Sequence, residues 1–130
     1  MDKKEWVIPE IEERKLTKWN WIVFHKNNLE LGKNTDIGAF TLLDASNGLK
    51  IEEDVQIGSH CSIYTRTTID NKNGKVHLKK NARIGSHSVV MPGVTIGENS
   101  IIGALSFVNK DIPANEVWVG CPAKFLKKLK

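Results

Sequence analysis

The sequence predicts an all-β fold, a parallel β-helix in which the chain winds through stacked triangular coils. Two observations lead to this prediction. Apolar residues recur every six positions along most of the chain, and a row of small or β-branched residues precedes them by two positions. A period of six fits neither the 3.6-residue turn of an α-helix nor plain strand alternation. Three six-residue edges close one triangular coil, as in hexapeptide-repeat β-helices.

The apolar row runs through the chain in three segments. Its members are Leu31, Ile37 and Leu43, then after a two-residue slip Ile51, Ile57, Ile63 and Ile69, and after a break holding DNKNGK (70–75) Leu78, Ile84, Val90, Ile96, Ile102 and Val108. The companion row comprises Thr35, Thr41, Val55, Cys61, Thr67, Val76, Ala82, Ser88, Val94, Ser100 and Ser106. Positions i and i+2 of a strand share one face, so both rows are expected to fill the prism. Cys61 is therefore expected to be structural.

The whole chain, 1–130, is expected to form one domain with three parts. Residues 29–112 would make about four to five coils, a prism roughly 20 Å tall. Residues 1–28 form an N-terminal cap segment, in which Trp6, Trp19 and Trp21 pack on the prism end; its secondary structure stays open. In the C-terminal extension (113–130), CPAKFLKKLK predicts a short amphipathic helix with Phe125, Leu126 and Leu129 facing inward.

Composition restricts the function classes. The 40% apolar and 26% charged residues are ordinary for a globular chain, and no apolar run reaches the roughly 18 residues of a membrane span. The start MDKKEWVIPE lacks a signal-peptide core, so a cytoplasmic protein with two reduced cysteines is expected. The net charge of +4 suggests an anionic partner, but lysines crowd the C-terminal stretch. A solvated tail explains much of that charge, so nucleic acid is not the expected partner.

The stretch 84–128 resembles the hexapeptide-repeat acyltransferases, a family of left-handed β-helices. The family ending IGAGSVVTKDIP…GxPAK appears here as IGALSFVNKDIP (102–113) and VGCPAK (119–124). The departures are Leu105 in place of a glycine, Phe107 in place of a smaller apolar residue and Asn109 in place of a threonine. The resemblance implies an acyltransferase that uses acetyl-CoA as co-substrate, without a metal, and a homotrimer with active sites between subunits.

The same resemblance implies where acetyl-CoA binds. The corners at Gly85, Gly103 and Ala104 would let the extended pantetheine arm approach the backbone closely. Lys110 and Lys124, at matching positions, would neutralise the CoA phosphates. Each glycine is equally explained as a structural corner, and each lysine as solvated surface.

The catalytic pattern departs from the sugar-acetylating branch of the family. There a histidine follows a strand similar to IYTxTHP, whereas this chain reads IYTRTTID (63–70). Thr68 occupies the histidine position, or Arg66 does under the neighbouring alignment. His60, in IGSHCSIYT (57–65), matches the family's active-site asparagine. His60 is therefore the candidate catalytic base or acceptor ligand, with a structural corner as the alternative.

The other three histidines have structural interpretations. His87 repeats the IGSH corner, His77 should point outward from its strand, and His25 precedes the repeats as a surface or capping residue.

Absence of the usual histidine favours an amine acceptor, because an amine loses a proton more readily than a sugar hydroxyl. An amino sugar on a nucleotide diphosphate, from cell-surface glycan biosynthesis, is the predicted acceptor. In that case the amine could lose one proton to water before it attacks, and the departing CoA sulfur could take the second proton, without a protein base. O-acetylation of a sugar or another small hydroxyl acceptor remains the alternative. The candidate acceptor-binding residues, each also explained as a corner or ladder residue, are Asn34, Asp36, Asp44, Tyr64, Arg66 and Thr68.

Two other classes stay open. A zinc enzyme on this prism would need three converging imidazoles, but the close histidine pair of that class is absent, since His77 and His87 are ten residues apart. A non-catalytic interaction module would keep the prism without a CoA cleft. The retained NKDIP…GCPAK ending argues against it, because a bare prism does not require those residues.

Overall fold

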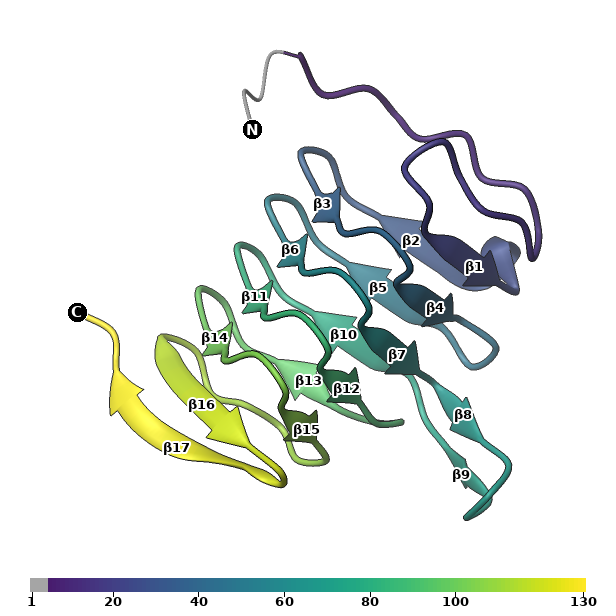
Figure 1. The fold of residues 1–130 in the computed structure, drawn as a ribbon. Helices are drawn as coiled ribbons and strands as arrows, with labels where there is room; N and C mark the ends of the chain where they lie inside the picture. The colour runs from purple at the N-terminus through teal and green to yellow at the C-terminus, as the bar shows by residue number, and fades with distance from the viewer. Residues whose placement is uncertain (1–4) are drawn as a thin grey trace.

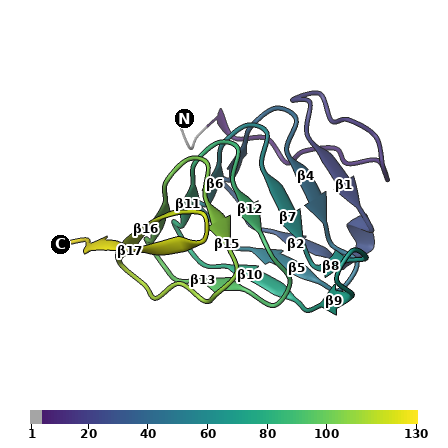
Figure 2. The ribbon, with the colours of Figure 1, turned by 60° about the horizontal axis from the view of Figure 1, so that its bottom comes forward.

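A computed structural model describes residues 5–130, and the chain winds in it as the parallel β-helix that the repeat predicts (Figure 1). Three sheets form the walls of the prism (Figure 2). Sheet A contains β1 (Ile22–Phe24), β4 (Leu42–Asp44), β7 (Ser62–Tyr64), β12 (Val89–Val90) and β15 (Phe107–Val108). Sheet B contains β2 (Leu29–Leu31), β5 (Leu49–Ile51), β10 (Val76–Leu78) and β13 (Thr95–Ile96). Sheet C contains β3 (Asp36–Ile37), β6 (Gln56–Ile57), β11 (Arg83–Ile84), β14 (Ile101–Ile102), β16 (Glu116–Gly120) and β17 (Ala123–Lys128).

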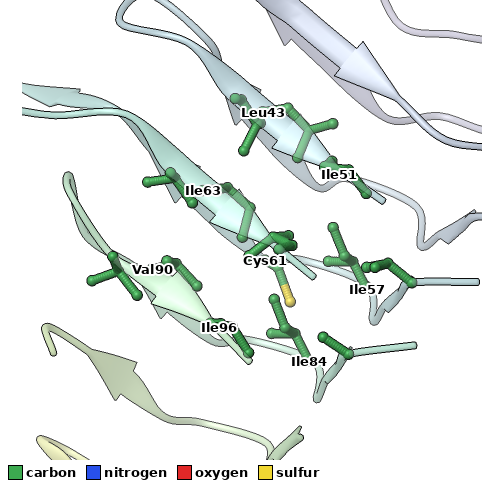
Figure 3. Packing of buried hydrophobic residues seen from close by; sticks show 14 of the residues in the cluster. Leu43, Ile51, Ile57, Cys61, Ile63, Ile84, Val90 and Ile96 are labelled. Atoms are coloured by element: carbon green, nitrogen blue, oxygen red, sulfur yellow. The ribbon is translucent and has the colours of Figure 1, made fainter. Parts of the chain in front are cut away.

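The apolar row forms the core of the prism. Side chains of successive coils stack in register, as Leu43 does on Ile63 and Ile63 on Val90 (Figure 3). Every predicted member is buried except Leu31, which is partly buried, and Ile69, which is exposed. The hydrophobic interior thus confirms the six-residue register over most of its length.

The small buried row connects each coil to the next. Thr41 Oγ1 donates a hydrogen bond to the Gly58 carbonyl (2.8 Å), Cys61 Sγ to that of Gly85 (3.2 Å) and Ser88 Oγ to that of Gly103 (3.2 Å). Burial raises the pKa of the Cys61 thiol, which keeps it protonated as a donor. Cys61 therefore does the same structural work as a threonine or serine.

The first coil begins earlier than residue 29. β1 pairs in parallel with β4, and Trp21 and Val23 are buried in the prism. A 3₁₀ turn, η2 (Lys26–Asn28), then leads into β2. Val23 lies eight residues before Leu31, as Leu43 lies eight before Ile51. In both places the spacing of eight is the six-residue period plus a two-residue slip. This shared spacing is the signal in the sequence that extends the repeat into the N-terminal segment.

The break in the repeat, which lies within the third coil between β7 and β10 (Val76–Leu78), begins before residue 70. Thr65 is buried, and its Oγ1 donates to the Asp44 carbonyl (2.9 Å). The chain then leaves the stack as an antiparallel hairpin of β8 (Arg66–Thr67) and β9 (Lys72–Asn73), which projects from the prism (Figure 1). Ile69 is 99% exposed in this hairpin. Its predicted place in the core is therefore wrong, because the insertion removes it from the coil path.

The predicted C-terminal helix is also wrong. Residues 123–128 form β17, which turns back antiparallel onto β16 at the end of sheet C. Phe125 and Leu126 are 49% and 59% exposed rather than facing inward. β16 offers a row of backbone partners to this segment, whereas an isolated helix this short is marginal in water. Pairing with the sheet therefore prevails over the amphipathic pattern.

Ile63 and Ile69 provide a matched test of the core. Ile63→Ala should destabilise the protein by about 2–5 kcal/mol, because it empties a fully buried position. Ile69→Ala should change the free energy of unfolding by only about 0.5 kcal/mol, as for other exposed sites. Urea unfolding of both variants measures the difference. Equal losses would contradict the hairpin placement.

Candidate functional site

His60 lies on the prism edge between sheets C and A. It occupies a left-handed corner (φ 57°), and its side chain is exposed. The imidazole of His87 stacks on it with ring centroids 4.7 Å apart and an interplanar angle of 3°. Phe40 packs on the other side at 5.3 Å. The edge therefore presents an aromatic column with two imidazoles.

The repeat determines the backbone of this column but not its side chains. Phe40, His60, His87 and Leu105 all have φ between 57° and 64°. The His60 N–H donates to the Ala39 carbonyl (2.9 Å), as the His87 N–H does to that of Ser59 (3.0 Å). Histidine tolerates this conformation better than phenylalanine or leucine. Sequence reasoning missed Phe40 as a neighbour of His60. Their separation of 20 residues is close to the length of one coil, and this spacing is the signal that could have placed them side by side.

An open depression of about 430 Å³ lies on sheet C beside the same edge. The predicted CoA-binding residues Gly85, Gly103 and Ala104 line it, together with Gly58 and Asp36. Gly58 is two residues before His60, so the depression reaches the corner that carries His60. An extended chain could approach the backbone closely along this small-residue rim.

The glycines of this rim also have a structural cause. A Cβ on Gly85 would lie 2.5 Å from the Ala104 backbone nitrogen, so stacking of the next coil already requires glycine there. A Cβ on Gly103 would instead meet the Val119 side chain at 2.7 Å. The rim therefore exists because coils stack closely, whether or not a ligand uses it.

The two predicted lysines belong to different parts of the prism. Lys110 follows β15 of sheet A, and Lys124 lies in β17 of sheet C. Both are exposed.

The predicted acceptor residues fall into two groups. Asp44 and Tyr64 are direct neighbours on the outer face of sheet A, and Arg66 and Thr68 continue from them into the exposed hairpin.

The second group lies elsewhere on the prism. Asn34 occupies the left-handed corner before sheet C, and Asp36 lies in β3 at the depression. Within one chain, Asp36 therefore lies beside the residues predicted to bind CoA, whereas the predicted acceptor residues of sheet A lie on another wall of the prism. His60 lies at the edge where those two walls meet.

His77 belongs to another face. Its Nε2 forms a hydrogen bond with the Glu52 carboxylate, which also accepts the Lys80 N–H (3.1 Å). Partial burial opposes ionisation of Glu52, but these bonds outweigh it and lower the pKa of the carboxyl group. Across residues 5–130, no three His, Cys, Asp or Glu side chains are grouped to hold a metal ion. The same part of the chain contains no helix that could cross a bilayer.

Comparison with known proteins agrees with this architecture. The family profile described as "Bacterial transferase hexapeptide (six repeats)" matches residues 75–110. The galactoside O-acetyltransferase of Lactococcus lactis subsp. lactis is 34% identical over 113 residues, covering 75% of this chain and 55% of that protein. The chain thus spans about half the length of this curated relative.

Two solved structures share the fold closely. A hexapeptide-repeat-containing acetyltransferase of Vibrio cholerae, in complex with acetyl coenzyme A, has a TM-score of 0.80 at 26% identity, covering 85% of this chain and 65% of that one. AntD, an N-acyltransferase from Bacillus cereus in complex with dTDP and 3-hydroxybutyryl-CoA, has a TM-score of 0.72 at 27% identity with the same coverage.

Substitution of the rim glycines separates their structural role from ligand binding. Gly85→Ala should lower the free energy of unfolding by about 1–3 kcal/mol, because its Cβ would collide with backbone. Gly103→Ala should be relieved in part by Val119→Ala, which removes the Cγ2 atom at 2.7 Å and leaves the Cβ of residue 119 at 3.1 Å. Chemical unfolding without ligand measures both. Unchanged stability of Gly85→Ala would contradict the stacking explanation.

Proposed function

Because the chain belongs to the hexapeptide-repeat acyltransferase family, we propose that it is an acetyl-CoA-dependent acyltransferase that N-acetylates an amino sugar on a nucleoside diphosphate. The carrying observation is the small-residue depression on sheet C that leads to the exposed imidazole of His60. Acetyl-CoA would supply the acetyl group as a reactive thioester. We place the reaction in the cytoplasm, in the supply of cell-surface glycans.

The chain's own residues divide the work at this edge. Gly85, Gly103 and Ala104 admit the pantetheine arm, and Lys110 and Lys124 attract the CoA phosphates. His60 accepts a proton from the attacking group. Its stacking between Phe40 and His87 limits ring rotation and holds it at the edge.

A second subunit completes the site in this proposal. His60 lies on a convex edge, whereas small-molecule sites enclose most of their ligand. The outer face of sheet A carries an apolar column in register, Ile22, Leu42, Val89 and Phe107, interrupted by Ser62. Such a column is suited to packing against another copy, and a closed trimer is a common symmetric solution. The neighbouring subunit would provide the missing wall for the acceptor.

The choice of an amine acceptor rests on two features. By the resemblance, Thr68, or Arg66 under the neighbouring alignment, takes the position where the sugar-acetylating branch has its histidine. The structural similarity to AntD, an N-acyltransferase in complex with dTDP, also supports an amine on a nucleotide-linked sugar. Asp44, Tyr64, Arg66 and Asp36 would then hold the acceptor, with the Arg66 guanidinium suited to a diphosphate.

O-acetylation of a small hydroxyl acceptor is the second candidate. The galactoside O-acetyltransferase, at 34% identity, supports it.

An acceptor panel distinguishes the two activities. Thiol release from acetyl-CoA should be fastest with nucleotide-linked 3-amino or 4-amino sugars, and slow with simple sugars and amino acids. Acetylation of simple sugar hydroxyls in preference to amino sugars would establish the second candidate. Absence of thiol release with every acceptor would contradict an enzyme of this class.

His60→Ala tests the proton acceptor, with His87→Ala as the matched control from the same stack. Loss of a general base should lower kcat/KM by about 10²–10⁴-fold in His60→Ala, while His87→Ala, which keeps the base and removes only the ring stacked on it, should cause a clearly smaller loss. Steady-state rates with the best acceptor provide the measurement. Near-normal turnover of His60→Ala would remove His60 from the chemistry and favour the route without a protein base.

A further inference from the structure

A pocket of about 320 Å³ lies at the N-terminal end of the prism, outside the depression described above. The segment that precedes β1 crosses this end of the coil stack (Figure 1). Three of the four tryptophans of the chain line the pocket, namely Trp6, Trp19 and Trp21. Such a concentration of indole rings around one cavity is not required by the six-residue repeat.

The three indoles are held in different ways. Trp21 is 3% exposed and packs in the core below the pocket. Trp6 is fixed over the first coil, because its Nε1 donates to the Thr35 carbonyl (2.9 Å). Trp19 is 39% exposed, and its backbone N–H donates to Thr17 Oγ1 (3.3 Å). The pocket thus has a rigid floor and an accessible aromatic wall.

Polar groups at the pocket complete its chemical character. Glu5 and Asp36 are among the residues that line it, and a carboxylate can accept hydrogen bonds from hydroxyl groups. The Lys18 ammonium lies 5.0 Å from the centroid of the Trp19 ring, at the same pocket. Flat aromatic surface, hydroxyl acceptors and one cation therefore converge on one cavity.

We propose that this pocket binds a nucleoside phosphate group: the base displaces the Lys18 ammonium from the Trp19 ring and stacks there, the ribose hydroxyls meet the carboxylates, and the displaced ammonium pairs with the phosphate. A plain sugar offers no planar ring or anion, and an inorganic phosphate offers no ring. The volume of about 320 Å³ is large enough for a base with its ribose. Stacking of bases on aromatic side chains is a general source of affinity for every base.

Its position connects the pocket to the acyl-transfer site. Asp36 lines both the pocket and the sheet C depression, so the two cavities adjoin. A ligand with a nucleoside at one end could place its other end beside the small-residue rim. The sources of the bound nucleoside phosphate rest on the proposed function. The first is the nucleotide half of the acceptor, and the second is the adenosine 3′,5′-bisphosphate half of CoA.

Tryptophan fluorescence tests the pocket directly. In the full chain carrying Trp118→Phe, the remaining indoles are the three that line the pocket. Titration with dTDP, UDP and adenosine 3′,5′-bisphosphate, without acetyl-CoA, should give saturable quenching with at least one of them. Tight binding of dTDP or UDP identifies the acceptor source, and tighter binding of the bisphosphate identifies CoA. Pyrophosphate, which lacks a base, should bind much more weakly.

Trp19→Ala should weaken the preferred nucleotide by about 5- to 150-fold, and Trp19→Phe should retain most of the affinity. Lys18→Met offers an independent variant, expected to weaken dTDP while leaving thymidine unchanged. No saturable quenching, equal binding of pyrophosphate, or unaltered affinity in Trp19→Ala and Lys18→Met would overturn the inference.

Binding without acetyl-CoA keeps this inference separate from the proposed function. A protein that acetylates amino sugars but fails these titrations overturns the nucleoside pocket alone. A protein that passes them but releases no thiol with any acceptor overturns the acyltransferase proposal alone.

Discussion

Close contact between the backbones of successive coils is the constraint on which the rest of this structure depends. A Cβ on Gly38 would lie 2.3 Å from the Ser59 nitrogen, and one on Gly58 would lie 2.6 Å from the Ser86 nitrogen. Side chains are therefore excluded from these corners. The same proximity lets the buried Thr41, Cys61 and Ser88 reach the carbonyls of the following coil. Glycine corners and small inward residues are two consequences of one spacing.

That constraint also separates structural positions from positions free to acquire function. The residue two positions after each of these glycines adopts a left-handed backbone, and its side chain projects from the edge. Phe40, His60, His87 and Leu105 occupy this position, which explains how chemically different residues share one geometry. A second column, on the edge between sheets B and C, carries Asn34, Asp54, Asn81, Asn99 and Asn115 instead. In it Asn99 accepts a side-chain hydrogen bond from Asn81 and donates one to Asn115. The first column carries the imidazoles and adjoins the depression on sheet C.

Departures from the six-residue period mark the parts of the molecule that the prism does not need. The hairpin of β8 and β9 leaves the stack within one coil, between β7 of sheet A and β10 of sheet B, and places Ile69 in solvent. The segment before β1 makes no coil of its own, yet it brings Trp6 over the first coil and closes a pocket with Trp19. Both elements add surface that stacking does not dictate. Specificity for an acceptor is expected to reside there, since the regular coils are shared by any protein with this repeat.

The sequence by itself determined the all-β coil, the inward rows and the structural role of Cys61, because each depends on a period that is visible in the residue order. It also identified the corner that carries His60. Only the tertiary structure decided that His87 stacks on His60, that Ile69 leaves the core and that residues 123–128 pair with β16. The physical reason is that these outcomes depend on partners 27 residues away or on an available sheet edge. A six-residue pattern shows which side chains face inward. It does not show which residues of neighbouring coils an outward-facing side chain contacts.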